Sequence, residues 1–328
     1  MLRLIMMGTG PFAVPTFRRL LESKHRMELL VTRPPRTLHG KQQSDVNPMR
    51  EVARVAGLPI FEPESVNTVE AQARLAGCQA DLLVVCDYGQ ILKPETIATA
   101  RLGGINLHAS LLPKYRGAAP VQWAVYHGET ETGVSVFQLT AGVDAGPLLA
   151  VARTAIGSNE TAVALESRLS ELGAGLVVET VAALDAGTAT PLAQEAGVAS
   201  RAPRLKKTDG QVDWSRPAAA IANQIRALAG WPKTYTDWLR PTGPPLRLIL
   251  EAATPENSSE NPVANALDGA NAPGQVLAAE GDRLLVAAGT GSLRIERLQP
   301  AGKRVLSAGE FLRGYPVRAG QRFGPAAD

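Results

Sequence analysis

The chain has 328 residues, of which 45% are hydrophobic and 20% are charged, and its formal net charge is only +3. This composition is typical of a globular protein with two domains, and it excludes a disordered or membrane-embedded chain. The apolar start of the chain stops at a Gly/Pro turn before it reaches the length of a signal peptide or a membrane span, so we expect a cytoplasmic protein.

Short apolar runs alternate with helical patterns through the first half of the chain. Strands are predicted at residues 2–7, 28–32, 81–86, 104–108 and 133–139. Helices are predicted at residues 15–23, 47–56, 68–75, 94–99 and 120–127, and a longer helix at about 160–186. This alternation predicts an α/β fold whose first domain, residues 1–190, has a doubly wound, Rossmann-like, mostly parallel sheet.

The second half of the chain has a different pattern of predicted elements. Residues 191–206 have little periodicity and are predicted to be a linker, followed by a helix at 216–228. Short strands are then predicted at residues 234–239, 246–252, 274–279, 283–288 and 292–298. They predict a small, OB-like β-barrel domain over residues 207–318, with a tail over 319–328.

Two local patterns refine this second domain. The S-x-x-E capping box that starts at Ser307 predicts a short final helix. Residues 254–273 lack any apolar period and are predicted to be a surface insertion.

A glycine turn follows the first predicted strand. Gly8, Gly10 and Ala13 fit the G-x-G-x-x-G/A spacing that holds the pyrophosphate of a dinucleotide. That fingerprint also requires an acidic residue at the end of the second strand, where this chain has Arg33. Arg33 is compatible with a 2′-phosphate, which leaves an NADP-binding oxidoreductase as an alternative, but a plain turn into a helix is favoured.

The most informative stretch is the predicted strand at 104–108. The two-residue period of a strand directs Ile105 and Leu107 to one face and Asn106 and His108 to the other. Ligands of open parallel sheets bind beyond the carboxyl ends of the strands, and this strand ends at His108. An amide and an imidazole side by side are typical of a site that stabilises an oxyanion during acyl transfer.

A carboxylate is predicted to lie beside this pair. Asp144 belongs to the loop that follows the predicted strand 133–139, where it would orient the imidazole and favour its charged form. No Ser or Cys sits in a nucleophile elbow, no spacing indicates metal ligands, and Cys78 and Cys86 match no disulfide or zinc pattern. We therefore expect direct transfer, with no covalent enzyme intermediate and no metal.

Positive charge is concentrated in one part of the chain. Residues 201–247 hold nine Lys/Arg and three Asp/Glu, whereas residues 251–282 hold six acids and no base. Such a run is compatible both with a solvated surface and with a face that binds phosphates.

These motifs resemble those of the folate-dependent formyltransferases. The resemblance rests on Asn106-x-His108, on the stretch SLLPKYRGAAP at 110–120 and on GVDAG at 142–146. Downstream, KKTDGQVDW at 206–214, IRA at 225–227 and GWP at 230–232 resemble the C-terminal domain of the methionyl-tRNA formyltransferase family. The resemblance extends from the first strand to about Pro316.

The resemblance implies a reaction and its partners. The donor would be 10-formyltetrahydrofolate, and the acceptor would be the α-amino group of methionine on initiator tRNA. Asn106 and His108 would stabilise the oxyanion, while Asp144 would hold His108 and help to relay a proton to the departing folate nitrogen. We expect a monomer that contacts no membrane.

The resemblance also implies two sets of binding residues. Folate would lie near Ser110, Leu111, Leu112 and Pro113 and near Tyr88, Gly89, Gln90 and Ile91. The tRNA would contact Arg36, His39, Lys41, Arg201, Lys206, Lys207, Arg226 and Lys233. The chain departs from the family pattern at His39, where a second arginine is expected, and at Asp87, where a small residue is usual.

Two alternatives remain open from the sequence. A formyltransferase could act on a small amine such as a nucleotide sugar, although the second domain with its basic run argues against this. The NADP-binding oxidoreductase is the other alternative, and the missing ribose acid argues against it.

Overall fold

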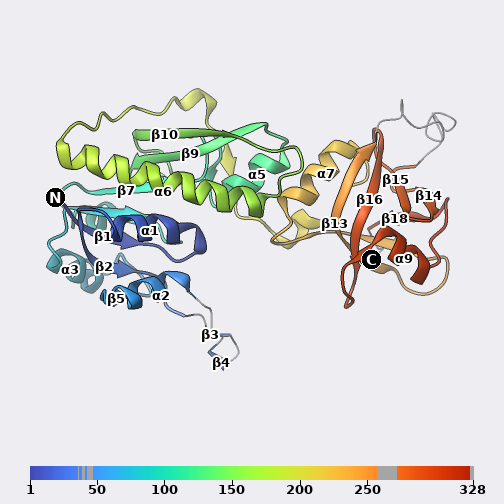
Figure 1. Cartoon of the computed structure of the whole chain (residues 1–328), viewed down its shortest axis with the longest axis horizontal. Helices are drawn as coiled ribbons and strands as arrows, with labels where there is room; N and C mark the ends of the chain where they lie inside the picture. The colour runs from blue at the N-terminus through green and yellow to red at the C-terminus, as the bar shows by residue number, and fades with distance from the viewer. Residues whose placement is uncertain (36, 39–40, 43–46, 257–271, 326–328) are drawn as a thin grey trace. The chain divides into compact units, whose positions relative to one another are not determined.

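The computed structural model describes residues 1–35, 37–38, 41–42, 47–256 and 272–325 (Figure 1). It consists of two compact units. The N-terminal unit comprises Met1–Pro120, Glu131–Ala155 and Leu165–Pro203, and the C-terminal unit comprises Val121–Thr130, Ile156–Ala164 and Arg204–Asp328. Two short segments of the predicted first domain thus pack with the C-terminal unit, and the predicted domain boundaries remain a prediction.

The N-terminal unit is built on a seven-stranded sheet with the order β10-β9-β7-β6-β1-β2-β5. Neighbouring strands from β7 to β5 are parallel, whereas β9 and β10 pair antiparallel. The strands are β1 Arg3–Met7, β2 Arg26–Val31, β5 Ile60–Phe61, β6 Leu82–Val85, β7 Gly104–His108, β9 Glu131–Gln138 and β10 Leu148–Ala155. The predicted mostly parallel, Rossmann-like sheet is confirmed.

The sequence pattern missed β10, and its position explains why. It is an edge strand in which no residue is fully buried, so its apolar signal is weak. Two further short pairs, β3 (Thr37–Leu38) with β4 (Lys41–Gln42) and β8 (Arg116–Gly117) with β11 (Arg201–Ala202), also escaped prediction.

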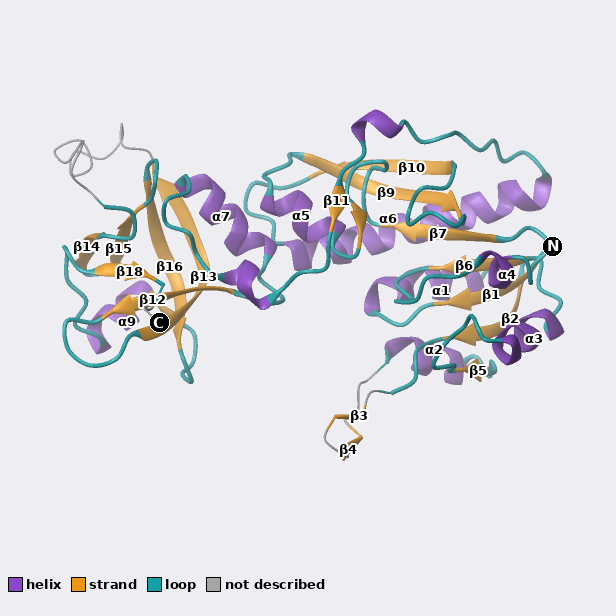
Figure 2. Cartoon of the chain, turned by 180° about the vertical axis from the view of Figure 1, so that it is seen from behind, coloured by secondary structure: helices purple, strands orange, loops and turns teal. Residues whose placement is uncertain are grey.

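Helices cover both faces of the N-terminal sheet. In Figure 1, α1 and α6 lie on the face toward the viewer, where Leu107 of β7 packs against Gly173 of α6. Figure 2, seen from behind, places α3 and α4 in front of the sheet, and Leu75 of α3 packs there with Ile5 and Val85. The helices of the N-terminal unit are α1 Val14–Leu21, α2 Pro48–Val55, α3 Val69–Gly77, α4 Pro94–Ile97 and, from Leu165 on, α6 Ala162–Ala186. Apart from Pro120, α5 (Pro120–Tyr126) belongs to the C-terminal unit.

The C-terminal unit is a curled antiparallel sheet with the order β14-β15-β16-β13-β12-β18. An isolated bridge between Gln275 and Arg322 joins the two ends of this order, which confirms the predicted small barrel. Its strands are β12 Thr234–Leu239, β13 Leu246–Glu256, β14 Val276–Glu280, β15 Arg283–Ala287, β16 Ser292–Pro300, β17 Leu306–Ser307 and β18 Arg322–Gly324.

Two helices pack on this barrel, α7 (Ala218–Ala227) and α9 (Ala308–Gly314). The predicted capping box is confirmed, because Ser307 Oγ accepts a hydrogen bond from Glu310 N while the Glu310 carboxylate accepts one from Ser307 N. The predicted insertion begins later than expected, since β13 continues to Glu256, and residues 257–271 lie outside the described residues.

The predicted linker is paired with the N-terminal unit. Leu192 forms an antiparallel bridge with Leu148, and β11 pairs in parallel with β8. This segment is therefore attached to the N-terminal unit by backbone hydrogen bonds. The paired stretches are too short to produce a hydrophobic period in the sequence. Within the described part of the chain, no helix combines the length and apolarity needed to cross a membrane.

Candidate active site

Asn106 and His108 lie at the carboxyl end of β7, in the middle of the N-terminal sheet. Asn106 is paired with Val85 of β6 in the sheet register and is half-buried, whereas His108 is only 7% exposed. The structure gives the Asn106 amide no hydrogen-bond partner within the described residues. This amide is thus available to a ligand at the strand end.

The His108 ring is held by the loop that follows its own strand. Its Nε2 atom lies 2.9 Å from the carbonyl oxygen of Tyr115. A carbonyl can only accept, so Nε2 carries the proton and donates it to this oxygen. The second ring nitrogen, Nδ1, is therefore the atom that remains for chemistry.

Asp144 faces this second nitrogen. Its Oδ2 atom lies 3.7 Å from His108 Nδ1, which is an electrostatic contact rather than a hydrogen bond. The same Oδ2 atom accepts a hydrogen bond of 2.8 Å from Gly117 N. Because the imidazole is buried and the carboxylate side chain is only 14% exposed, water screens their interaction weakly.

The route by which Asp144 reaches His108 differs from the prediction. β9 runs antiparallel to β7, with Gln138 opposite Ile105 and Ser135 opposite His108, so the carboxyl end of β9 lies away from His108. The loop after β9 must therefore fold back toward the end of β7. The predicted proximity is present, but the predicted reason for it was wrong.

The segment predicted to hold folate next to His108 is fixed by β9. Ser135 Oγ donates to Ser110 O at 2.7 Å and accepts from Leu112 N at 3.1 Å, while Ser110 Oγ donates to Lys114 O. Ser110 and Leu112 are consequently buried, and Leu111 and Pro113 are half-buried. Contact with a ligand is thus open to Leu111, to Pro113 and to the backbone of this segment.

The second predicted folate segment divides in a similar way. Tyr88 packs into the core beside Leu92, and its buried hydroxyl has no hydrogen-bond partner among the described residues. Gln90 bonds to the backbone of residues 63–66. Gly89 is exposed, and Ile91 is an apolar side chain that is 67% exposed. Gly89 and Ile91 therefore fit a ligand surface, whereas the side chains of Tyr88 and Gln90 serve the fold.

The Asp87 carboxylate lies against Gly10 of the glycine turn. A Cβ at Gly10 would lie 1.7 Å from the Oδ2 atom of Asp87, and Thr9 N donates to Asp87 O at 3.0 Å. Desolvation and then the charge of Glu166 raise the pKa of Asp87 to about 6, although part of the side chain is exposed. A pyrophosphate brought to this turn would meet a carboxylate, which argues against dinucleotide binding.

The predicted basic residues have different surroundings. Arg201, Lys206 and Lys207 are exposed, as is Arg204, which the sequence pattern did not single out. Lys233 lies 3.3 Å from the Glu251 carboxylate. Arg36 and His39 lie outside the described residues, and of Lys41 only the backbone is described, in β4.

Arg226 is engaged by its own chain. It donates to Gly157 O, Glu160 O and Asn223 Oδ1, and burial lowers its pKa. These bonds engage the guanidinium with the segment around Glu160, and a contact of Arg226 with tRNA stays a prediction.

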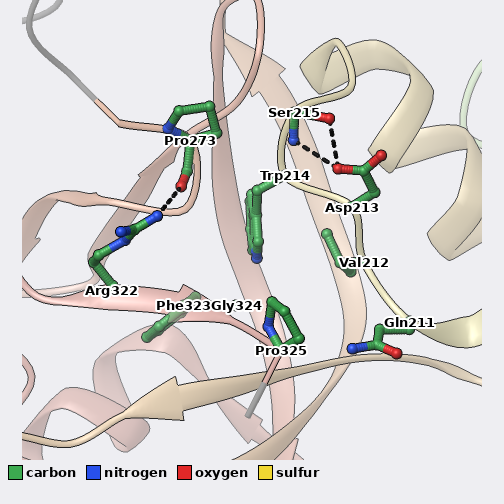
Figure 3. Close-up of a pocket in the computed structure, with 10 residues that line it drawn as sticks. All are labelled: Gln211, Val212, Asp213, Trp214, Ser215, Pro273, Arg322, Phe323, Gly324 and Pro325. Carbon is green, nitrogen blue, oxygen red and sulfur yellow. Dashed lines mark hydrogen bonds between the residues drawn. The ribbon is translucent and has the colours of Figure 1, made fainter. Parts of the chain in front are cut away.

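A pocket of about 460 Å³ lies in the C-terminal unit, between the residues around Trp214 and residues 322–325 (Figure 3). Its charged side chains already bond to protein groups, Asp213 to Ser215 and Arg322 to Pro273 O. None of the predicted catalytic or binding residues that the structure describes lines it.

Comparison with known families matches both parts of the chain. The formyl transferase family matches residues 2–181, and the formyl transferase C-terminal domain matches residues 204–316. The methionyl-tRNA formyltransferase of Rhodopirellula baltica is 42% identical over 332 residues, covering 98% of this chain and 96% of that protein. The methionyl-tRNA formyltransferase of Citrifermentans bemidjiense is 39% identical over 323 residues, with the same coverage.

Solved structures share the fold. An N-formyltransferase from Helicobacter canadensis, in complex with folinic acid and dTDP-3-aminofucose, aligns with a TM-score of 0.65 at 17% identity over 92% of this chain and 100% of that chain. HypX from Aquifex aeolicus, in complex with tetrahydrofolic acid, aligns with a TM-score of 0.59 at 19% identity over 96% of this chain and 48% of that one. The family matches and the relatives above 30% identity span almost the whole sequence, so the chain belongs to the methionyl-tRNA formyltransferase family.

Proposed function

We propose that this protein transfers the formyl group of 10-formyltetrahydrofolate to the α-amino group of methionine on initiator tRNA. The observation that carries the proposal is the constellation at the end of β7. There the His108 imidazole lies between the Tyr115 carbonyl and the Asp144 carboxylate, beside an Asn106 amide that has no partner within the described residues. It provides donors for an oxyanion and a carboxylate for the proton, which are the two requirements of formyl transfer.

In the proposed reaction the amine nitrogen attacks the formyl carbon and forms a tetrahedral intermediate. The formyl oxygen gains negative charge, which N–H groups of Asn106 and of a protonated His108 Nδ1 would stabilise. Asp144 would offer a negative charge to the ring when it is protonated, because its Oδ2 atom lies 3.7 Å from that nitrogen. The bond from the formyl carbon to N10 then breaks, and the proton lost by the amine ends on N10.

The surroundings of these residues fit a folate. The exposed apolar side chains of Ile91 (67% exposed) and Val143 (54% exposed) come from the loops after β6 and β9. Covering such side chains with a flat ring system is favourable, at about 25 cal/mol per Å² of apolar surface buried. Gly89 has a φ of 83°, a conformation that favours glycine, so the turn after β6 requires a residue without a Cβ at this position.

For the tRNA we propose contacts with the exposed cations Arg201, Arg204, Lys206 and Lys207. Contacts of this kind neutralise phosphates and supply affinity that is insensitive to sequence. Because the proposed acceptor is a substrate of translation initiation, we propose that the protein acts in the cytoplasm. A monomeric state stays a prediction.

The deciding experiment offers purified protein 10-formyltetrahydrofolate together with one acceptor at a time. We expect formylation of methionyl initiator tRNA with a kcat/KM far above that for a dTDP-amino sugar or glycinamide ribonucleotide. A preference for a small amine would contradict the proposed acceptor while keeping the formyl chemistry. NADP binding without formyl transfer would contradict both.

A further inference from the structure

The segment from Leu192 to Ala202, which we call the strap, touches both loops that hold His108. At its start, Leu192 and Leu148 exchange backbone hydrogen bonds of 2.7 and 2.8 Å beside the loop of Asp144. At its end, β11 pairs with β8 in the loop of Tyr115. The strap therefore joins two loops that come from different strands.

Gln194 is the residue of the strap that reaches the Asp144 loop. Its Nε2 atom donates to Asp144 O at 2.9 Å and to Gly146 O at 2.7 Å. Its Oε1 atom accepts from Arg116 Nη2 at 2.6 Å and from Nε at 3.2 Å. Gln194 is half-buried, whereas its described neighbours from Pro191 to Ser200 are exposed. One amide thus links the loop of Asp144 to the loop of Tyr115.

Ser200 fixes the other side of the histidine. Its Oγ atom accepts from Tyr115 N at 2.9 Å, and its carbonyl accepts from Arg116 N at 2.9 Å. Tyr115 is the residue whose carbonyl accepts from His108 Nε2. On this side, Tyr115 is therefore the single residue that connects the strap to the imidazole through hydrogen bonds.

Both residues that face the imidazole have unusual backbones. Tyr115 has a φ of 60° and Asp144 a φ of 48°, in the left-handed region that residues with a Cβ rarely adopt. A conformation of this kind is strained and persists only where the surroundings enforce it. In this protein the strap supplies hydrogen bonds at both positions, to Tyr115 N and to Asp144 O.

We propose that the strap sets the geometry of the proposed catalytic histidine and that Gln194 is a positioning residue for Asp144. The inference rests on the proposed formyl transfer. The loop after β9 has to fold back toward His108, and the two donor bonds of Gln194 hold it there. Without these two bonds the Asp144 carboxylate would move away from Nδ1. Its electrostatic interaction with the His108 ring would then be weaker while the ring donates to the oxyanion.

The test compares Gln194→Ala and Gln194→Glu with wild type and with Glu195→Ala, an exposed neighbour in the same strap. Gln194→Glu keeps the shape and the acceptor for Arg116 but cannot donate to Asp144 O and Gly146 O. We expect both Gln194 variants to lower kcat for methionyl-tRNA by about tenfold, or roughly 1.4 kcal/mol on the barrier. The KM values for tRNA and folate should stay within about twofold of wild type, and Glu195→Ala should match wild type.

The split between kcat and KM separates positioning from a structural role. A displaced carboxylate changes the chemical step, so kcat should fall in both Gln194 variants while the KM values for tRNA and folate stay near wild type. A variant that merely unfolds in part would lose kcat in proportion to its unfolded fraction, which thermal melts measure. A kcat equal to that of wild type in folded Gln194→Glu would overturn the inference.

Failure of this inference is distinguishable from failure of the proposed function. Wild type that does not formylate methionyl-tRNA contradicts the function itself. If wild type formylates methionyl-tRNA and the Gln194 variants match wild type, only the inference about the strap is contradicted. As an independent readout, Ser200→Ala removes the bond to Tyr115 N, and we expect it to lower kcat with KM unchanged.

Discussion

The Nδ1 atom of His108 lies 3.7 Å from the Oδ2 atom of Asp144, although His108 ends β7 and Asp144 lies in the loop after β9, which runs antiparallel to β7. This separation is too long for a hydrogen bond, so Asp144 acts on the ring mainly through its charge. In the same structure Asp144 accepts from Gly117 N, which an asparagine oxygen can also do.

Asp144→Asn should therefore keep the fold and lose the charge effect. We expect kcat to fall by at least about a hundredfold, because a neutral amide no longer offers a negative charge to the His108 ring during the reaction. Steady-state kinetics with methionyl-tRNA measures this, with Asp282→Asn, at an exposed aspartate of the C-terminal unit, as the matched control. Turnover of Asp144→Asn close to wild type would remove Asp144 from the mechanism.

Asn106→Ala and His108→Ala test the proposed oxyanion donors. Each substitution removes one donor, and such a loss typically slows acyl transfer by about a hundred- to a thousandfold. We expect this loss in kcat, with circular dichroism and thermal melts showing a folded protein for Asn106→Ala, whose amide makes no hydrogen bond within the described residues. A turnover within a fewfold of wild type in either variant would contradict its assignment.

Residue periodicity was sufficient to predict the main elements. The buried strands β1, β2, β6 and β7 are apolar runs bounded by turn residues, and such runs report burial directly. The Ser, Pro and Gly residues that follow His108 also predicted the end of β7, which places Asn106 and His108 at its carboxyl end. The edge strand β10 was missed because partial burial leaves little contrast between its residues.

The surroundings of His108 could not be predicted in the same way. The Nε2 atom of His108 bonds to the backbone carbonyl of Tyr115. Every residue has such a carbonyl, so the residue type at position 115 does not predict this hydrogen bond. Gln194 bonds across 50 residues to Asp144 O from a segment without periodicity. The close approach of Asp87 to Gly10 also joins distant segments, so the spacing of the glycines predicted the turn but not the side chain that lies against it.

Charge reversal at Lys206 and Lys207 tests the proposed tRNA binding. Both side chains are exposed, and the double variant Lys206→Glu/Lys207→Glu should raise the KM for methionyl-tRNA while kcat stays near wild type. The slope of log affinity against log salt should become shallower by roughly one for each phosphate that the variant no longer neutralises. Lys303→Glu, at another exposed lysine of the C-terminal unit, is the control. An unchanged KM and salt slope would exclude both lysines from tRNA binding.

Asp87 should make the stability of the protein depend on pH. Its pKa is raised from 3.8 to about 6 by desolvation and by Glu166, so the folded state binds its proton more tightly than the unfolded chain does. The free energy of unfolding should then fall as pH rises from about 4 to about 6, relative to Asp87→Asn, which lacks this proton. Urea titrations of both proteins at pH 4, 6 and 7 measure the difference, which should be largest at pH 6 and above. A constant difference across this range would contradict the raised pKa.

Gly10 and Asp87 should be energetically coupled. A Cβ at Gly10 would lie 1.7 Å from the Asp87 carboxylate, so Gly10→Ala has to displace either that side chain or the turn. In the Asp87→Ala background the space is open, and the same substitution should cost much less stability. A double-mutant cycle of unfolding free energies measures the coupling, which should exceed about 1 kcal/mol. Equal costs of Gly10→Ala in the two backgrounds would mean that the turn needs its glycine for another reason, such as the approach of a ligand phosphate.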